Sequence, residues 1–426
     1  MQIEKYVLKV VPLRFRGADL NFELSHALFS SFDIDAGSRL LLKLVGKHIV
    51  PEMVSRIIDI GSGVGVLGIA CARGYPGSSV AFRDRDALAL AFTARNARLN
   101  KVKPVALEHA LFLDGLAGSS FDLVLCNVPA KAGVPALDRF FRDMPGILGG
   151  KGNAAVVVVN TIAEAARQSI VAGGGDIWMA EEASGHTALL FRRAAGPGHA
   201  PDAAINSAAG NDASSVDSSP AGSDSWAVRE RTEAMVKLGS ARYRFKGYWG
   251  LPEFDTPSFA TVLAAEVLEN LPSGGQPRRI ALINPGPGRL ACFIRSRIRG
   301  RIDLCSRDAL SLAAAERNLD LNWPGDAGRD VAGPGSGKGR LIVASIDELP
   351  DSAYDLVIEF ADLTPRVDTS TERWEGVARQ LKDGGAYIAV MPSTAFDRFE
   401  RRKPKSFSKL REKKKKGWAC GLWRRE

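Results

Sequence analysis

A glycine-rich loop is the first feature of the sequence that could do chemistry. DIGSGVG at 59–65 follows the strand-like run RIIDI and leads into the helix-like run VLGIACAR. Glycines at alternate positions permit left-handed backbone conformations and let a ligand lie directly against backbone N–H groups. Because Gly63-x-Gly65-x-x-Gly68 also satisfies the dinucleotide fingerprint, the loop alone fits a nicotinamide cofactor, another adenosine-containing cofactor or a structural turn. The candidate binding residues of the loop are Asp59, Gly61, Gly63 and Gly65.

A carboxylate stands at the end of the next strand-like run, SVAFRD at 79–84. Asp84 follows the glycine loop by about 20 residues, at the position where a carboxylate can accept hydrogen bonds from both ribose hydroxyls of an adenosine. The neighbouring Asp86 is the better candidate for the N-cap of the following helix, since it recurs later in the chain and Asp84 does not. We therefore expect Asp84 to bind the cofactor and Asp86 to begin the helix.

A buried strand that ends in Asn-x-Pro separates these alternatives. FDLVLCNVPA at 121–130 places Asn127, Val128 and Pro129 at the mouth of the expected crevice. An Asn amide oxygen and the adjacent backbone carbonyl can accept both hydrogen bonds of an –NH₂ group and direct its lone pair along an S–CH₃ axis. The motif indicates in-line methyl transfer to an amine, with no metal and no covalent intermediate. An ordinary strand-end turn has the same composition and stays open as an alternative.

These side chains need a sheet whose strands all end on one side. The first half alternates the strand-like runs RIIDI, SVAFR, FDLVL and AAVVVV with helical patterns that include 66–73, 86–99 and 136–147. Alternating β and α segments imply a mostly parallel sheet with helices on both faces and a ligand crevice at the carboxyl ends of the strands. The loop, the carboxylate and the Asn-x-Pro motif all fall at such ends.

The same plan is used twice along the chain. Residues 194–225 consist almost wholly of Ala, Gly, Ser, Pro, Asp and Asn, which predicts a disordered linker between domains at 1–193 and 226–426. The tetrapeptide RDAL occurs at 85–88 and again at 307–310. Such self-similarity predicts two tandem Rossmann-like α/β domains, each with a terminal hairpin.

The second copy lacks the residues that would carry the chemistry. Leu282 stands where the first copy has Asp59, Ser306 replaces Asp84, and Phe360 replaces Asn127. The loop INPGPGR has two prolines, which lack N–H donors, and its Arg289 is expected to crowd the crevice. We interpret this half as a packing and substrate-binding module.

These motifs together resemble a known family. Residues 25–193 are similar to the small methyltransferase domain of the bacterial ribosomal RNA guanine-N2 methyltransferases, which are class I S-adenosylmethionine-dependent enzymes. The resemblance rests on Phe29-Ser30, on DAGSRLLL at 35–42, on the glycine loop, on Asp84 and on FDLVLCNVPA. It implies that Asp35, Gly37 and Ser38 lie over the cofactor, and that a duplication left one copy degenerate.

Two departures from the family pattern bear on the substrate. The Asn-Pro-Pro-Phe of the family is Asn127-Val128-Pro129-Ala130 here, so the first Pro and the aromatic that would stack on a flipped base are missing. Stacking contributes roughly 1–3 kcal/mol per base, so another aromatic must supply it or the substrate differs. The family usually keeps its active copy second, whereas here it is first.

Charge and composition indicate the partners. Residues 398–426 contain 13 Lys and Arg against 3 Glu and so account for the net charge of +9. This basic ending, with Trp418 and Trp423 in its expected hairpin, suits RNA, although the tryptophans fit equally well packed under the sheet. No apolar run is long enough to span a membrane, and the five scattered cysteines indicate neither zinc nor disulfides. We expect a cytoplasmic protein with no metal and no membrane contact, and its oligomeric state stays open.

The sequence therefore predicts an S-adenosylmethionine-dependent methyltransferase that acts on an exocyclic amine of structured RNA, with guanine N2 of ribosomal RNA as the leading acceptor. A protein glutamine methyltransferase is the first alternative, because it uses a similar Asn-Pro-Pro-aromatic site. A non-catalytic RNA-binding or assembly factor is the second, favoured by Ala130 and by the eroded second copy. A nicotinamide oxidoreductase is a more distant third.

Overall fold

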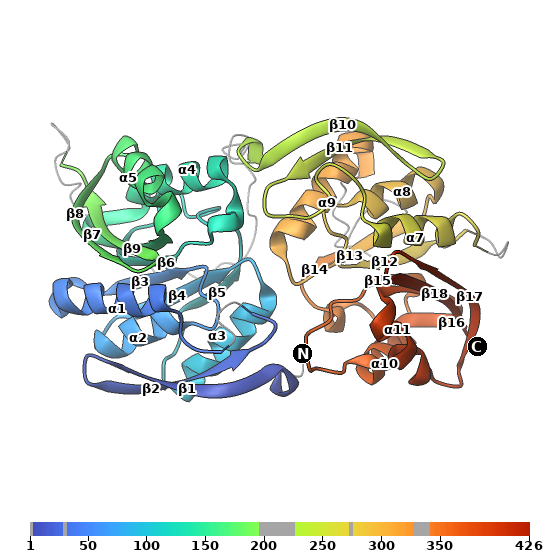
Figure 1. Cartoon of the computed structure of the whole chain (residues 1–426), viewed down its shortest axis with the longest axis horizontal. Helices are drawn as coiled ribbons and strands as arrows, with labels where there is room; N and C mark the ends of the chain where they lie inside the picture. Colours follow the sequence, from blue (N-terminus) through green and yellow to red (C-terminus); the bar gives the residue numbers. More distant parts are fainter. Residues whose placement is uncertain (1–2, 29–31, 196–225, 272–275, 327–340) are drawn as a thin grey trace, which may run out of the picture.

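The computed structural model describes residues 3–28, 32–195, 226–271, 276–326 and 341–426 (Figure 1). Most of the predicted linker at 194–225, and Phe29-Ser30 of the family resemblance, lie outside these residues. The described part contains two seven-stranded sheets and two separate hairpins. No helix of this part is long and apolar enough to cross a membrane.

The first sheet has the strand order β5-β4-β3-β6-β7-β9-β8. All neighbouring strands are parallel except β9, which runs antiparallel to β7 and to β8. The strand order reverses direction between β3 and β6, which is where open α/β sheets bind ligands. The strands are β3 (Arg56–Ile60), β4 (Ser79–Asp84), β5 (Ala106–His109), β6 (Phe121–Asn127), β7 (Leu148–Val159), β8 (Gly175–Ala183) and β9 (His186–Arg193).

Helices cover both faces of this sheet (Figure 1). Alternate residues of one strand point to opposite cores: Leu123 and Leu125 of β6 join the core on one face, and Val124 joins the core on the other. This explains why the strands read as continuous apolar runs. The first core lies under α1 (Ala36–His48), α2 (Val66–Gly74) and α3 (Ala87–Leu99), and the second under α4 (Val134–Asp143) and α5 (Ala163–Ala172).

The expected helix at 136–147 is wrong at its C-terminal end. The helix α4 ends at Asp143, and Met144–Ile147 forms a 3-10 turn instead. Pro145 lacks the N–H that would continue the α-helical ladder and restricts the residue before it. The helices expected at 66–73 and 86–99 agree with α2 and α3 to within one residue at each end.

A β-hairpin at the N-terminus packs against the helices of the first core. Its strands are β1 (Val7–Phe15) and β2 (Ala18–Ser25). The Asn96 side chain of α3 accepts a hydrogen bond from Glu23 N at 2.8 Å and donates one to Glu23 O at 3.1 Å. The buried side-chain amide of Asn96 thus makes the same two hydrogen bonds to the backbone of β2 that a neighbouring strand would make.

The second half repeats this architecture and confirms the predicted fold class. Its sheet has the equivalent order β14-β13-β12-β15-β16-β18-β17, preceded by a hairpin of β10 and β11. The strands are β10 (Glu230–Leu238), β11 (Ala241–Tyr248), β12 (Arg279–Ile283), β13 (Arg301–Cys305), β14 (Ile342–Val343), β15 (Tyr354–Phe360), β16 (Leu381–Pro392), β17 (Phe407–Lys415) and β18 (Trp418–Arg425). The helices are α7 (Phe259–Leu268), α8 (Arg289–Arg297), α9 (Ala309–Asn322), α10 (Ser370–Gln380) and α11 (Ser393–Arg401).

The C-terminal hairpin forms as predicted, but its tryptophans belong to the core. Trp423 is fully buried, and its ring centroid lies 5.2 Å from that of Trp374. Trp418 is half-buried and packs against the other core of this domain. The alternative of packing under the sheet therefore holds for Trp423, which has no face left to stack on RNA.

Candidate functional site

The glycine loop adopts the conformation that its sequence predicts. Gly61, Gly63 and Gly65 have φ angles of 71°, 57° and 87°, all in the left-handed region. Space for a ligand remains above the first two, because a Cβ atom on either would meet no atom within 4 Å. A Cβ on Gly65 would lie 2.7 Å from Ile69 Cδ1, so this glycine serves the packing of α2. The loop is thus an open cradle followed by a tightly packed helix start.

Asp59 lies beneath this loop and does not face the space above it. The side chain is 1% exposed, and Oδ2 accepts a hydrogen bond from Gly68 N at 2.8 Å. The other oxygen is buried and has no hydrogen-bond partner in the described structure. Burial raises the pKa of Asp59 to about 7. This placement favours a role in holding the loop on α2 over direct contact with a ligand.

Asp84 lies beside the loop at the end of β4. Its Oδ2 accepts a hydrogen bond from Gly63 N at 2.8 Å, and its Oδ1 accepts one from Asp86 N at 2.8 Å. Burial raises the pKa of Asp84, and these two hydrogen bonds oppose the rise. Each carboxylate oxygen retains a further lone pair for a ligand hydroxyl. Asp86 itself accepts from Leu88 N at 2.9 Å, which confirms it as the N-cap of α3.

Asn127 is held by the residues that precede and begin α1. Its Nδ2 donates to Asp35 Oδ1 at 3.0 Å and to Ser38 Oγ at 3.1 Å. Asp35 caps α1 through Ser38 N at 3.0 Å, and Ser38 Oγ donates to Asp35 Oδ2 at 2.6 Å. An ionised carboxylate can only accept, so the amide nitrogen of Asn127 must face it. The amide oxygen is therefore turned away from Asp35 and is available to accept a hydrogen bond from a substrate.

Gly37 allows α1 to approach the start of β9. A Cβ on Gly37 would lie 2.9 Å from Cδ2 of His186, so an alanine would displace the imidazole. The Nδ1 of His186 is buried and has no hydrogen-bond partner among the described residues. Sequence reasoning missed His186, because a single histidine at a hairpin has no motif around it.

The acceptor loop comprises residues 128–133. Val128 is buried, and its N–H donates to Val157 O at 2.9 Å, so strand pairing continues one residue beyond β6. Pro129 is exposed and precedes the 3-10 turn Ala130–Ala132. Gly133 then meets the second domain, since its Cβ would lie 2.6 Å from Trp249 Cβ. Pairing with β7 fixes the backbone at Val128, and the second domain borders the far end of the loop.

Phe32 is an aromatic residue that sequence reasoning missed. It is 63% exposed and stands three residues before Asp35. The following Asp33 is fixed by an ion pair with Arg39 at 2.9 Å, and the Phe32 ring lies edge-on to His26 with centroids 5.3 Å apart. The sequence analysis requires another aromatic in place of the one missing after Asn-x-Pro but does not identify it, because Phe32 comes from the distant segment that holds Asn127.

The corresponding loop of the second domain keeps its shape without its chemistry. Asn284, Gly286 and Gly288 have φ angles of 56°, 55° and 94°, close to those of the three glycines in the first domain. The expectation that Arg289 crowds the crevice is wrong. Its guanidinium lies 4.0 Å from the Phe245 ring centroid and donates to a backbone carbonyl near the hairpin.

A cavity of about 890 Å³ lies at the carboxyl ends of the second sheet. Its lining includes Ser306, Arg307 and the buried Glu359, which is paired with Arg373. The hydroxyl of Ser306 thus stands where the first domain has Asp84, and the ion pair of Glu359 lies next to Phe360, which takes the place of Asn127. The described residues of neither domain contain a cluster of three or more metal-binding side chains.

Comparison with known proteins assigns the first domain. Residues 19–171 match the family model of the methyltransferase small domain. The first domain is a methyltransferase small domain. At the level of this domain, the predicted class of methyltransferase is confirmed.

Two relatives named as ribosomal RNA methyltransferases align with this domain. The large subunit methyltransferase G of Photobacterium profundum is 37% identical over 142 residues, which cover 31% of this chain and 37% of that protein. The small subunit methyltransferase C of Chromohalobacter salexigens is 33% identical over 152 residues, which cover 34% of this chain and 44% of that protein. The chain thus spans less than half the length of either relative.

Among the solved structures that resemble this chain, one matches both of its domains. The Thermus thermophilus 16S rRNA N2 G1207 methyltransferase, in complex with AdoMet and guanosine, has a TM-score of 0.64 and covers 100% of both chains. Its sequence identity is 17%, so the match concerns the fold alone. It confirms the predicted fold class of two tandem Rossmann-like α/β domains.

Proposed function

We propose that this protein transfers a methyl group from S-adenosylmethionine to an exocyclic amine of structured RNA, with guanine N2 of ribosomal RNA as the leading acceptor. The observation that carries the proposal is the orientation of Asn127. Asp35 and Ser38 hold its amide nitrogen, which leaves the amide oxygen to receive an amine. The two relatives that act on ribosomal RNA by name support the choice of RNA.

The cofactor fits the first domain and not the second. The open space above Gly61 and Gly63 can receive the cofactor, and Asp84 would accept hydrogen bonds from its ribose hydroxyls. The matched position in the second domain is Ser306, which lacks a carboxylate. When bound, S-adenosylmethionine supplies an electrophilic methyl group on a cationic sulfur, so the protein needs only to bind and orient the two reactants.

The acceptor amine would be oriented by two oxygens. Asn127 Oδ1 and the carbonyl of Val128 would each accept one N–H of the amine, which leaves its lone pair facing the methyl group. As positive charge develops on the nitrogen, both N–H groups become stronger donors. These hydrogen bonds therefore strengthen in the transition state and stabilise it more than the bound substrate.

Phe32 would take the part of the aromatic that is missing at Ala130. It is exposed, and three extended residues place its Cα within about 11 Å of the Cα of Asp35, which binds Asn127. A phenyl face next to the amine-binding oxygens would stack on a base flipped out of its helix.

The full-length protein incubated with methyl-labelled S-adenosylmethionine should label deproteinised ribosomal RNA, and nuclease digestion should release the label as N2-methylguanosine. Label in a protein fraction instead would identify a protein glutamine methyltransferase. Cofactor binding without transfer to either would identify a non-catalytic factor. Both of these outcomes contradict the proposal.

A further inference from the structure

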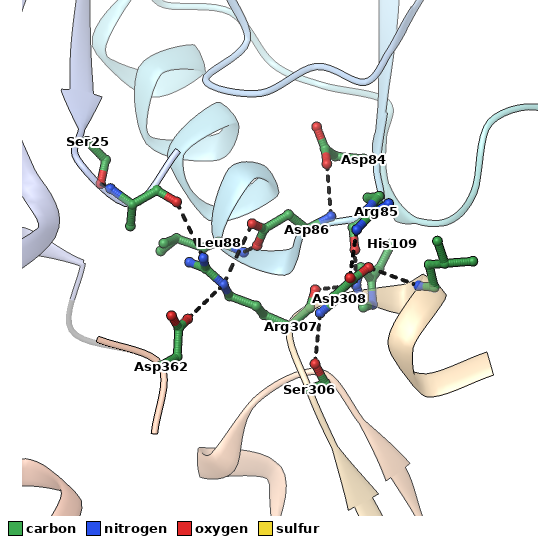
Figure 2. A network of polar contacts seen from close by, with 12 residues as sticks. Ser25, Asp84, Arg85, Asp86, Leu88, His109, Ser306, Arg307, Asp308 and Asp362 are labelled. Atoms are coloured by element: carbon green, nitrogen blue, oxygen red, sulfur yellow. Dashed lines mark hydrogen bonds and ion pairs between the residues drawn. The ribbon is translucent and has the colours of Figure 1, made fainter. Parts of the chain in front are cut away.

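Equivalent segments of the two domains meet around Asp86 and Asp308 (Figure 2). Ala87 N donates to Arg307 O at 2.8 Å, and Ala309 N donates to Arg85 O at 2.8 Å. His109 Nε2 lies 2.9 Å from the carbonyl oxygen of Arg85 and 2.8 Å from that of Arg307. Because both carbonyls can only accept, this nitrogen carries the imidazole proton. The repeated RDAL segments thus form a short antiparallel bridge.

The side chains of the bridge are also reciprocal. Arg85 Nη2 lies 2.8 Å from Asp308 Oδ2, and Arg307 Nε lies 3.7 Å from Asp86 Oδ2. Arg307 makes a further ion pair with Asp362 at 3.1 Å. Each arginine therefore reaches across to the aspartate that caps the other domain's helix.

Only one side of this bridge leads to a carboxylate that could bind the cofactor. In the first domain, Asp86 N donates to Asp84 Oδ1, and Asp84 Oδ2 accepts from Gly63 N. In the second domain, Asp308 N donates to the hydroxyl of Ser306 at 3.2 Å. The hydrogen bonds and ion pairs between the two segments are nearly symmetric, but only the first domain has a carboxylate next to them that could bind a ligand.

Arg307 fixes two segments of the first domain at once. Besides its ion pair with Asp86, its Nη2 donates to the carbonyl of Ala27 at 3.3 Å, just after β2. Burial raises the pKa of Asp86 to about 6, and the positive charge of Arg307 is the main influence that lowers it. A planar guanidinium with five N–H donors can hold these groups in one geometry. Without Arg307, the Asp86 carboxylate would lose its counter-charge in a half-buried position.

We propose that Arg307 of the second domain is a positioning residue for the cofactor-binding carboxylate Asp84. It acts through Asp86, whose side chain it pairs with and whose N–H holds Asp84. The inference rests on the proposed function, since it concerns the binding of S-adenosylmethionine. It also assigns the degenerate domain a specific task at the site of the other domain.

A double-mutant cycle tests this route. Arg307→Met removes the guanidinium, and Asp86→Asn removes the paired charge while keeping an N-cap, because Asn and Asp cap helices about equally well. Calorimetry on the full-length protein measures the Kd for S-adenosylmethionine. We expect each single variant to raise the Kd about 3–10-fold, and the double variant to raise it no further than the stronger single one.

Arg229→Met is the matched control, because Arg229 makes another contact between the domains. It pairs with Asp114 of the first domain at 2.9 Å, and Asp114 belongs neither to the glycine loop nor to the RDAL segments. We expect this control to leave the Kd within twofold of the wild-type value. An equal rise in Kd for the control, or additive effects in the cycle, would overturn the role of Arg307. Absence of cofactor binding in the wild-type protein would instead refute the proposed function.

Discussion

The buried carboxylate of Asp59 makes a prediction about stability that can be worked out from its surroundings. Its pKa is raised from 3.8 to about 7 because burial disfavours the charged form. The folded state therefore holds a proton on Asp59 between about pH 4 and pH 7, where the unfolded chain has released it. Its contribution to stability is fully present below about pH 4 and is lost as the pH rises to about 7.

The substitution Asp59→Asn removes this charge at little change in shape. At about 1.4 kcal/mol per pH unit, the raised pKa corresponds to about 4 kcal/mol lost by the wild-type protein above pH 7. The amide oxygen can still accept from Gly68 N, while the new NH₂ group occupies the place of the unpaired oxygen, at a cost of about 1–3 kcal/mol. We expect the variant to be about 1–3 kcal/mol more stable than wild type at pH 8, and no more stable at pH 4.

Urea unfolding at a series of pH values measures this difference. With an m-value of about 2 kcal/mol/M, the midpoint should rise by about 0.5–1.5 M at pH 8. Asp122→Asn is the control, because Asp122 is half-exposed at the start of β6 and accepts from two backbone N–H groups. If the free energy of unfolding of Asp59→Asn varies with pH as that of the wild type does, or is lower than the wild-type value at pH 8, Asp59 is not isolated from water and from hydrogen-bond partners.

Three further predictions concern the site, and a fourth concerns the C-terminal hairpin. Asp84→Ala should weaken S-adenosylmethionine binding by about 1.5–3 kcal/mol in calorimetry, because it removes a charged acceptor. Asn127→Ala should leave that affinity nearly unchanged and abolish turnover, because it removes the group that orients the acceptor amine. Phe32→Ala should raise the KM for RNA about 5–150-fold, in line with roughly 1–3 kcal/mol for stacking on one base, and Phe32→Trp should restore it. Reversing the charges of Lys413 to Lys416 should lower RNA affinity and flatten its dependence on salt in filter binding.

Each of these predictions has a matched control. Ser306→Ala and Phe360→Ala change the corresponding positions of the second domain and should leave one cofactor bound per chain. If they eliminate binding while Asp84→Ala does not, the division of labour between the domains is wrong. Val171→Ala, at a residue 62% exposed on α5, should leave the KM for RNA unchanged. Unchanged RNA binding after the lysine reversal would exclude the C-terminal hairpin as a contact surface.

The lysines of that hairpin are less free than the sequence indicates. Lys413 and Lys415 lie 2.9 Å and 3.5 Å from Glu266 of α7, and Lys414 lies 3.1 Å from Asp397. Exposed ion pairs of this kind contribute about 0–1 kcal/mol, so phosphates can replace the carboxylates at small cost. Glu266→Gln should then strengthen RNA binding if the hairpin contacts RNA.

The sequence was sufficient for features that depend on neighbours along the chain. The strand ends at Asp84 and Asn127, the left-handed glycine loop and the N-cap at Asp86 follow from local pattern, turn chemistry and capping. The repeat at 85–88 and 307–310 was also apparent from the sequence, but the contact between its two copies was not. Nothing in either copy indicates that the two would pair with each other.

The remaining features depend on contacts between distant segments. Asn127 meets Asp35 across 92 positions, and no spacing rule connects the two motifs. Arg289 was expected in the crevice because it follows the loop, yet the aromatic face of Phe245 offers its long side chain a better contact. Trp423 could equally have been a surface or a core residue until the packing around Trp374 was known.

The bridge between residues 85–87 and 307–309 bears on how such a protein can arise. A contact made of equivalent segments is self-complementary, so a single unit that carried it would pair with its own copy as a two-fold dimer. Fusion of two such units makes the pairing intramolecular and so raises the effective concentration of each segment for the other. Once pairing no longer depends on two identical chains, one partner can exchange its ligand-binding residues for others and keep its place in the assembly. The second domain has Ser306 where the first has Asp84, whereas the reciprocal arginine–aspartate ion pairs between the domains are preserved. This is the pattern that such a history would leave.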